Sequence, residues 1–513
     1  MPVALGSSQG KWLMTATILA SAMAFIDGTA LNVALPALQK NLNASAPDLF
    51  WILNAYLLML ASLILIGGSL GDKLGRKKIF MLGIFIFIAG SAACGFATTV
   101  FYLIAFRVIQ GIGGALMIPG SLALISSSIN ENQRGKAIGT WSAATTAVTM
   151  GGPILGGALA DAGLWRYIFF INVPIGVAAL LILLRYVKET RDEDADAAID
   201  YGGAFVITIS LALLTYGFLK IPARGFNDVQ VIISLTAGIA LLCFFILIER
   251  KSQHAMMPLH LFSNRNFSGT NLLTFFLYAA LGGGMLFLSL NLVQVQGYSQ
   301  LQSGLTFLPF TILMITITRF AGSLSDKYGP RWFLVLGPAV VGVGLLMLSF
   351  VKQTDGPADF WTTFFPGILI FGLGMAVTVS PLTSTVMGSL QSHFSGTASG
   401  INNAVTRISN VFANAVFGAL AVLFFAGALH NEVDHLSLDV NEKQLILKQA
   451  ANLGNAKPPT EISEQKAMIE NAYHASFISS YQNIMRICAS LGFLAAVAAF
   501  LFISNTRELR VER

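Results

Sequence analysis

Phe25-Ile-Asp-Gly-Thr-Ala-Leu-Asn-Val-Ala-Leu-Pro36 forms the second half of the first long apolar run of the sequence, which extends from residue 12 to residue 35. Asp27 is the only carboxylate within that run. A carboxylate placed in lipid is costly unless a proton or a cation neutralises it, and such a residue is usually functional. Asp27 is therefore the first candidate for a proton-binding group.

The composition of the whole chain indicates a membrane protein. Hydrophobic residues make up 55% of the 513 residues, charged residues only 11%, and the mean hydropathy is +0.70. So few polar side chains cannot cover a soluble globule of this size. Because the apolar runs have the length of spanning helices, about 20 residues, the sequence predicts an all-α integral membrane protein.

Fourteen spans are expected, and an even number places both termini on one side of the membrane. The loops on the side of the N-terminus carry eighteen lysines and arginines, against five in the short loops opposite. The positive-inside rule therefore predicts cytoplasmic termini, and the net charge of +6 reflects topology rather than a nucleic-acid partner. The expected spans are 12–35, 50–71, 79–99, 101–127, 137–160, 166–187, 201–220, 229–249, 268–295, 303–324, 332–350, 361–388, 399–427 and 480–503.

An internal repeat divides the chain. Gly68-Ser-Leu-Gly-Asp-Lys-Leu-Gly-Arg-Lys77, the first loop copy, recurs 254 residues later as Gly322-Ser-Leu-Ser-Asp-Lys-Tyr-Gly-Pro-Arg331, the second loop copy. Six helices of about 30 residues would give an offset of about 190, so two extra helices lie between the halves. The predicted plan is 6+2+6, with a first half at 1–190, an acidic linker and inserted pair at 191–260, and a second half at 261–513.

Several motifs together resemble a known family. They are Asp-x-Thr-x-x-Asn-Val-Ala-Leu-Pro from Asp27, Arg107-Val-Ile-Gln-Gly111, Gly152-Pro-x-x-Gly-Gly157, and Trp165-Arg-Tyr-Ile-Phe-Phe170. In this order they are similar to the signatures of the fourteen-spanning drug:proton antiporters of the major facilitator superfamily, although Val148 stands where the family signature has glycine. The resemblance implies the major facilitator fold and proton-driven efflux by alternating access.

Arg107 in the fourth span is the expected partner of Asp27. At 1.5 Å per residue, Asp27 lies about 8 Å below the outer face of a core about 30 Å thick, and Arg107 lies about 9 Å below the same face. Arg107 could therefore stabilise the Asp27 carboxylate in one conformation and release it to a proton in another. A static pair that only fixes packing, or an arginine that extends to the outer interface, are the alternatives.

The predicted gating residues lie in the two loop copies and in the fifth span. Glycines let helix ends approach closely, and the loop aspartate can accept from a helix N-terminus or an arginine, whereas an ordinary tight basic loop is the alternative. A Gly-Pro step in the fifth span favours a bent helix. The candidates are Gly68, Asp72, Gly75, Arg76, Gly152, Pro153, Gly156, Gly157, Gly322, Asp326 and Arg331.

The predicted substrate cavity is lined by amides and aromatic rings. Polar residues of span thirteen recur every three or four positions, so one face of that helix is expected to turn inward. The candidates are Asn32, Asn54, Tyr56, Gln110, Asn271, Phe275, Asn291, Gln294, Asn402, Arg407 and Asn410. Such a lining suits amphipathic molecules, bound by apolar area and oriented by few polar contacts.

The sequence thus predicts a proton-coupled antiporter of the cytoplasmic (inner) membrane that exports amphipathic, cationic drugs or toxic compounds. Because arginines outnumber acids in the spans, lipid-like or anionic amphiphiles stay open as substrates. No span holds paired acids or histidine ligands for an enzyme, and the lone Cys94, Cys243 and Cys488 suggest no metal site.

Beyond small substrates, protons and the lipid bilayer, no partner and no cofactor is expected, and the proton gradient would supply the energy. We expect a monomer. Residues 428–478 form the only long loop, on the outer side, and dependence on an adaptor protein that binds there is left open.

Overall fold

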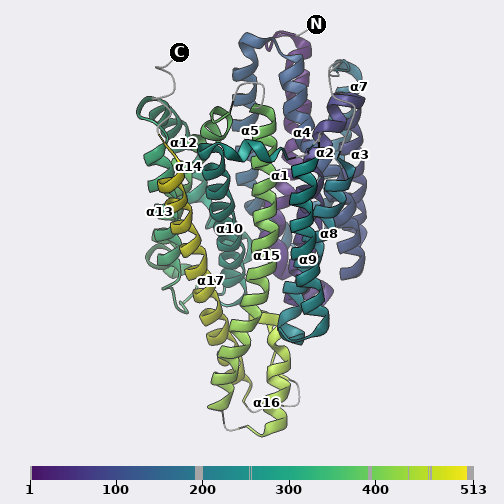
Figure 1. The fold of residues 1–513 in the computed structure, drawn as a ribbon. Coiled ribbons are helices and arrows are strands. Elements are labelled where there is room, and N and C mark those ends of the chain that lie inside the picture. The colour runs from purple at the N-terminus through teal and green to yellow at the C-terminus, as the bar shows by residue number, and fades with distance from the viewer. Residues whose placement is uncertain are drawn as a thin grey trace.

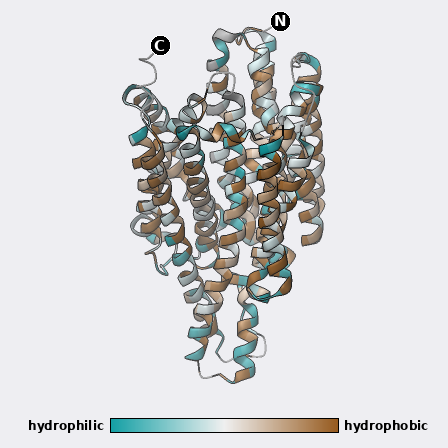
Figure 2. Cartoon of the chain, viewed as in Figure 1, coloured by the Kyte–Doolittle hydropathy of each residue, from teal (hydrophilic) through white to brown (hydrophobic). Residues whose placement is uncertain are grey.

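The computed structural model describes residues 3–190, 200–252, 255, 257–390, 395–436, 438–459, 462 and 465–504. These residues form helices and no named β-strand, as the apolar pattern predicts. Both described chain ends lie at one end of the molecule, and α16 lies at the other (Figure 1). We call the first the cytoplasmic end, following the charge prediction, and the second the outer end. Hydrophobic residues cover the middle of most helices, and hydrophilic ones gather at the two ends (Figure 2).

The segment expected to form the first half, 1–190, contains five long helices and a broken sixth. Helix α2 begins at a capping box in which Ser45 and Asp48 satisfy each other's backbone N–H groups, with a proline in its first turn, a strong N-terminal signal. The helices are α1 (Ser8–Leu42), α2 (Ala46–Leu74), α3 (Arg76–Phe96), α4 (Val100–Ser128), α5 (Glu131–Asp161), α6 (Tyr167–Phe170) and α7 (Asn172–Tyr186).

The inserted pair is α8 (Tyr201–Arg224) and α9 (Val229–Lys251), which pack on each other. The second half contains η1 (Leu259–Ser263), α10 (Arg265–Gln294), α11 (Gln300–Leu305), α12 (Leu308–Tyr328), α13 (Arg331–Leu348), η2 (Pro357–Asp359), α14 (Phe360–Gly388), α15 (Ser395–Asp434), α16 (Val440–Leu447), η4 (Lys448–Asn455) and α17 (Lys466–Phe502).

Thirteen of the described helical segments are long and apolar enough to cross a membrane, so the expected count of fourteen is not confirmed. The fifth expected span, 137–160, lies within α5, which has 31 residues but is not among the thirteen. Its sequence is rich in glycine, serine and threonine, and such small residues suit close packing against other helices. Helix α5 packs along α1 and against α11.

The two halves meet along two seams. Helix α2 packs against α15 on one side, and α5 packs against α11 on the other. Helix α8 contacts both α2 and α15, so the inserted pair covers the first seam. Two halves joined at such seams place the facing sides of α1, α2, α4, α10 and α15 near the centre of the molecule.

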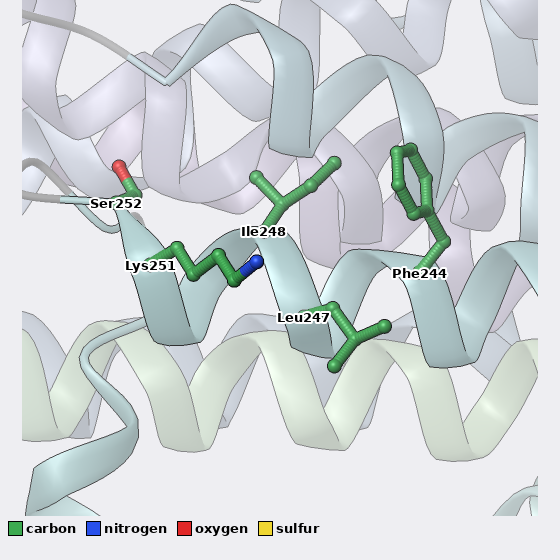
Figure 3. Close-up of a pocket in the computed structure, with 5 residues that line it drawn as sticks. All are labelled: Phe244, Leu247, Ile248, Lys251 and Ser252. Atoms are coloured by element: carbon green, nitrogen blue, oxygen red, sulfur yellow. The ribbon is translucent and has the colours of Figure 1, made fainter.

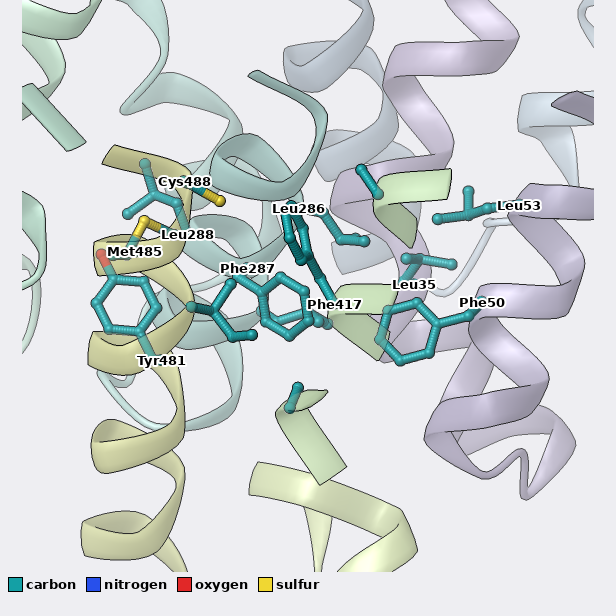
Figure 4. Packing of buried hydrophobic residues seen from close by; sticks show 14 of the residues in the cluster. Leu35, Phe50, Leu53, Leu286, Phe287, Leu288, Phe417, Tyr481, Met485 and Cys488 are labelled. Carbon is teal, nitrogen blue, oxygen red and sulfur yellow. The ribbon is translucent and has the colours of Figure 1, made fainter. Parts of the chain in front are cut away.

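Near the outer end, one apolar cluster joins the halves. Leu35 and Phe50 of the first half lie in the same cluster as Phe287 and Phe417 of the second (Figure 4). The rings of Phe50 and Phe287 are 5.9 Å apart. Toward the cytoplasmic end the core of the first half is a separate cluster, to which the second half contributes only Ala404 among the described buried residues. The outer end is therefore the more tightly closed of the two.

Residues of the expected outer loop at 428–478 are largely helical. Helix α16 lies at the outer tip of the molecule (Figure 1), where it contacts α15, and η4 contacts both α15 and α17. Tyr473 of α17 donates to the carbonyl of Ile446 in α16, over 3.3 Å. Segment η4 contacts the outer ends of α2 and α10, so this extension lies over the seam rather than hanging free.

Candidate functional site

Asp27 and Arg107 meet at the centre of the first half. Nη1 of Arg107 lies 2.5 Å from Oδ2 of Asp27, and the two side chains are 1% and 0% exposed. Gln110 donates from Nε2 to Oδ1 of Asp27 over 2.9 Å and accepts from Nη1 of Arg107 over 2.8 Å. Both oxygens of the carboxylate are therefore engaged.

The rest of the Arg107 side chain is equally well held. Its Nε donates to the carbonyl of Ile52 in α2 over 3.2 Å. Its guanidinium carbon lies 4.3 Å from the centre of the Tyr56 ring, a cation-π distance. Three helices, α1, α2 and α4, thus fix one buried ion pair. Such a pair adds little to the free energy of unfolding, because desolvation of the two charges offsets much of their attraction. It does keep both Asp27 and Arg107 in their charged forms.

In the second half, the polar residues near the centre of the molecule lie on α15. Asn402 of α15 donates to Oδ1 of Asn271 and to the hydroxyl of Thr274 in α10, over 3.2 and 2.8 Å. Further along α15, the guanidinium carbon of Arg407 lies 6.0 Å from the centre of the Phe25 ring in α1. Asn410, three residues on, faces Gly282 of α10. The polar stripe predicted for span thirteen therefore turns toward the other helices.

Other predicted cavity residues are scattered. Asn54 and Asn291 are 0% exposed, and neither amide group has a hydrogen-bond partner among the described residues. Asn32 is half-buried in α1. The ring of Phe275 lies 5.8 Å, centre to centre, from the tilted ring of Phe412, so it packs between α10 and α15. Gln294 lies at the outer end of α10, where it donates to Gln39 over 2.9 Å.

The first loop copy forms a compact junction. Nε of Arg76 lies 2.6 Å from Oδ1 of Asp72, so the expected arginine partner lies within the motif itself. Glu189, which follows α7, accepts from the backbone N–H groups of Lys77 and Lys78 at the start of α3. Gly75 between them has φ +115°, a conformation that favours glycine. Gly68 faces Pro119 of α4.

The second loop copy is built differently. Asp326 is exposed, and Arg331 donates to the carbonyl of Phe500 in α17 over 3.2 Å. Gly322 packs against Ser380 of α14. Pro330 occupies the position of Arg76, so the second copy lacks the arginine that pairs with the aspartate in the first.

The glycines of α5 lie where the halves close at the outer end. A Cβ at Gly157 would be 2.3 Å from the carbonyl oxygen of Gln300 in α11, so only glycine permits this approach. Gly152 and Gly156 face α1 on the other side, and the carbonyl of Pro153 abuts Gly304 of α11.

Sequence reasoning missed two residues of this outer closure. Asp161, at the end of α5, accepts from the backbone N–H groups of Gln300 and Leu301 over 2.7 and 2.8 Å and so caps α11 of the other half. Gln39 of α1 donates to the carbonyl of Asn452 in η4. The available signal was an acid at the end of the fifth expected span, four residues after Gly157.

A surface groove lies apart from this centre. Phe244, Leu247, Ile248, Lys251 and Ser252, all on or next to α9, line it (Figure 3). It holds no acid and belongs to the inserted pair, so it shares no residue with the central ion pair.

Two groups of membrane-spanning helices that meet across their outer ends, with an ion pair buried within the first group, are typical of a transporter. Comparison with known proteins agrees. Residues 17–414 match the family model of the Major Facilitator Superfamily, and the chain belongs to that superfamily.

Relatives within the superfamily carry names of resistance and export. The chain is 30% identical over 482 residues to the tetracenomycin C resistance and export protein of Streptomyces glaucescens, with 93% of this chain and 88% of the relative covered. It is 29% identical to the multidrug resistance protein Stp of Mycobacterium tuberculosis (strain CDC 1551 / Oshkosh), with coverages of 86% and 82%. It is 30% identical to the methylenomycin A resistance protein of Bacillus subtilis (strain 168), with 82% and 90% covered. The chain is thus a transporter and not an enzyme, and these relatives support drug efflux.

Solved structures show the same fold. A bacterial homologue of the human lysosomal transporter Spinster, in an inward-facing and unoccupied conformation, superposes with a TM-score of 0.68. The identity is 18%, and 97% of this chain and 98% of that chain are covered.

Proposed function

We propose that this protein exports amphipathic compounds across the cytoplasmic membrane in exchange for protons, with Asp27 as the proton-binding group. The observation that carries the proposal is the Asp27–Arg107 ion pair, which is buried at 0% and 1% exposure between α1 and α4. Protonation of Asp27 would remove the charge that holds Arg107. A proton can therefore change the contact between two helices.

The state of the molecule suggests a direction for the exchange. The outer ends of the halves are joined by Gly157, Asp161 and the cluster around Phe50. Asp27 is paired with Arg107 in this outer-closed state, as expected for a carboxylate that has released its proton toward the cytoplasmic end. If opening the outer end draws α1 and α4 apart, a buried carboxylate without its cation would favour a proton from outside. Outward movement of substrate and inward movement of protons would then alternate.

The sequence favoured cationic substrates because a cation could compete with the proton for Asp27. In the outer-closed state both Asp27 oxygens are engaged by Arg107 and Gln110. A cation would therefore find no free oxygen on Asp27 in this state. We retain a monomer as the working unit, with the proton gradient as the energy source.

Proteoliposomes that hold the intact chain would test this proposal. We expect dye uptake when the imposed pH gradient drives protons in the direction opposite to the dye. Asp27→Asn should lower that uptake at least about tenfold, while dye binding persists. Asp434→Asn makes the same change of carboxylate to amide in the outer extension, so it should transport normally. Gradient-driven uptake that survives in Asp27→Asn would show that another group carries the proton.

A further inference from the structure

Arg407 lies in the middle of the membrane-spanning region and has no acidic partner among the described residues. It lies twelve residues into α15, about 18 Å from the start of that helix, near the middle of a core about 30 Å thick. Among the described residues no ion pair includes it, and its Nε atom is buried with no hydrogen-bond partner. The side chain as a whole is half-buried, so part of it stays accessible.

The neighbours of Arg407 place it between the two halves rather than against lipid. Phe25 of α1 lies under its guanidinium at 6.0 Å. Its charge also acts on the side chains of Tyr56 in α2 and Tyr278 in α10. The Tyr56 ring also packs against the ion pair, with its centre 4.3 Å from the guanidinium carbon of Arg107.

The charges around Tyr56 do not balance. Arg107 and Asp27 neutralise each other, and both oxygens of Asp27 already accept hydrogen bonds. Arg407 adds a positive charge that no described residue offsets. Arginines in the membrane core are rare and are normally paired or line a functional path.

The nearby groups suit an anion with an apolar body. A guanidinium presents several N–H donors in a planar fork that matches a carboxylate or sulfonate. The ring of Phe25 offers apolar surface next to it. A cation, by contrast, would meet the unpaired Arg407 and an acid that is already neutralised.

We propose that Arg407 binds the anionic group of the substrate, so that the transported compounds include amphipathic anions with a carboxylate or sulfonate on an aromatic body. This inference rests on the proposed export function, whose substrate class it specifies. The substrate would supply the counter-charge that the protein lacks, and the binding site would be complete only when loaded.

A matched pair of fluorescent probes tests the inference. 8-Anilinonaphthalene-1-sulfonate and N-phenyl-1-naphthylamine share one ring system and differ by the sulfonate. Binding would be measured with the intact chain in lipid nanodiscs, with the signal of empty nanodiscs subtracted. We expect Arg407→Gln to weaken binding of the sulfonate about tenfold or more and that of the neutral probe less than about twofold, since only the sulfonate loses charge-assisted hydrogen bonds.

Two further variants separate recognition from folding. Arg407→Lys keeps the charge but not the planar fork, so its loss of sulfonate binding should be intermediate. Arg486→Gln removes an exposed arginine near the middle of α17 and should leave both probes unchanged. Equal weakening of both probes in Arg407→Gln, or unchanged sulfonate binding, would overturn the inference. So would an intact chain that binds the sulfonate no more tightly than the neutral probe.

Transport of the same probes distinguishes this inference from the export proposal. If a pH gradient drives uptake of neither probe while the binding contrast holds, the anion site stands and proton-driven export is wrong. If the gradient drives uptake of the neutral probe but Arg407→Gln weakens binding of both probes equally, the export proposal is supported and the proposed anion site is wrong.

Discussion

The two halves of the molecule treat their central arginines in opposite ways. Arg107 of the first half is 1% exposed and binds Asp27, Gln110 and a backbone carbonyl. Arg407 of the second half is half-buried, and its Nε atom has no partner. A charge that is paired and hydrogen-bonded within the protein holds its neighbours in one arrangement. A charge without such partners is available to bind a ligand of opposite charge. The contrast suggests that the first half holds the proton-coupling group and the second half recognises the substrate.

Removal of each arginine should have opposite effects on stability. Arg107→Gln leaves the Asp27 carboxylate buried without its cation, so we expect a loss of about 3–5 kcal/mol in the free energy of unfolding. Arg407→Gln removes a partly buried cation that has no acid, so stability should stay unchanged or rise. Thermal unfolding in detergent without substrate would measure both. A comparable loss in the two variants would mean that Arg407 also has a structural partner, and the contrast between the halves would fail.

Closure of the outer end should depend on the close approach of α5 to α11 that Gly157 permits. In Gly157→Leu the side chain would collide with the Gln300 carbonyl, and overpacking of this kind costs about 1–3 kcal/mol. The outer-closed state should therefore lose population about fivefold to a hundredfold, and transport should fall with it. A cysteine placed at buried Ser303 would report this as faster labelling by an impermeant maleimide added outside.

An unchanged labelling rate in that experiment would show that α5 and α11 separate without difficulty in the native protein. Gly139→Leu would serve as the matched control, because nothing lies within 4 Å of the Cβ position at Gly139 in the same helix.

The Asp161 cap on α11 should make a smaller contribution. Asp161→Ala removes the acceptor of two backbone N–H groups, but the site is exposed, so we expect a cost of about 1 kcal/mol to the outer-closed state. The same Ser303→Cys labelling should accelerate about fivefold. If Asp161→Asn, which keeps one acceptor oxygen, accelerates labelling as much as alanine does, the charge and not the hydrogen bonds closes the seam.

Substitutions in the two loop copies should have the smallest effects on transport, and the first copy should be the more sensitive of the two. Asp72→Asn breaks the 2.6 Å contact with Arg76, a partly exposed pair worth up to about 1 kcal/mol, so transport should fall several-fold. Asp326→Asn changes an exposed residue and should alter transport less than twofold. Initial uptake rates in proteoliposomes would measure both. Equal effects would indicate that Asp326 finds a partner in another conformation.

The sequence was most informative where one physical requirement dominates. Apolar runs of spanning length predicted the helices, and a depth estimate from the helical rise was enough to place Asp27 and Arg107 at the same level, where they are in contact. The count of fourteen spans is not confirmed, because α5, which contains the fifth expected span, is not among the thirteen helices found among the described residues.

Contacts between helices of different halves could not be predicted in this way. The side of α10 on which Gln294 or Phe275 lies depends on the rotation of that helix, which periodicity alone did not fix. The link from Gln39 to η4 joins residues more than 400 positions apart, and no local pattern signals it. The role of every site residue remains a prediction until the experiments above are made.

The inserted pair has a consequence for compounds that dissolve in the bilayer. Helix α8 contacts both α2 and α15, and α9 packs on α8, so one seam between the halves is shielded from surrounding lipid. A compound that diffuses within the membrane toward this side meets two additional helices, whereas the seam between α5 and α11 has no inserted helix against it among the described contacts. Lateral capture from the bilayer would therefore be one-sided, and the composition of the lipid facing α5 and α12 would matter more than that facing α9.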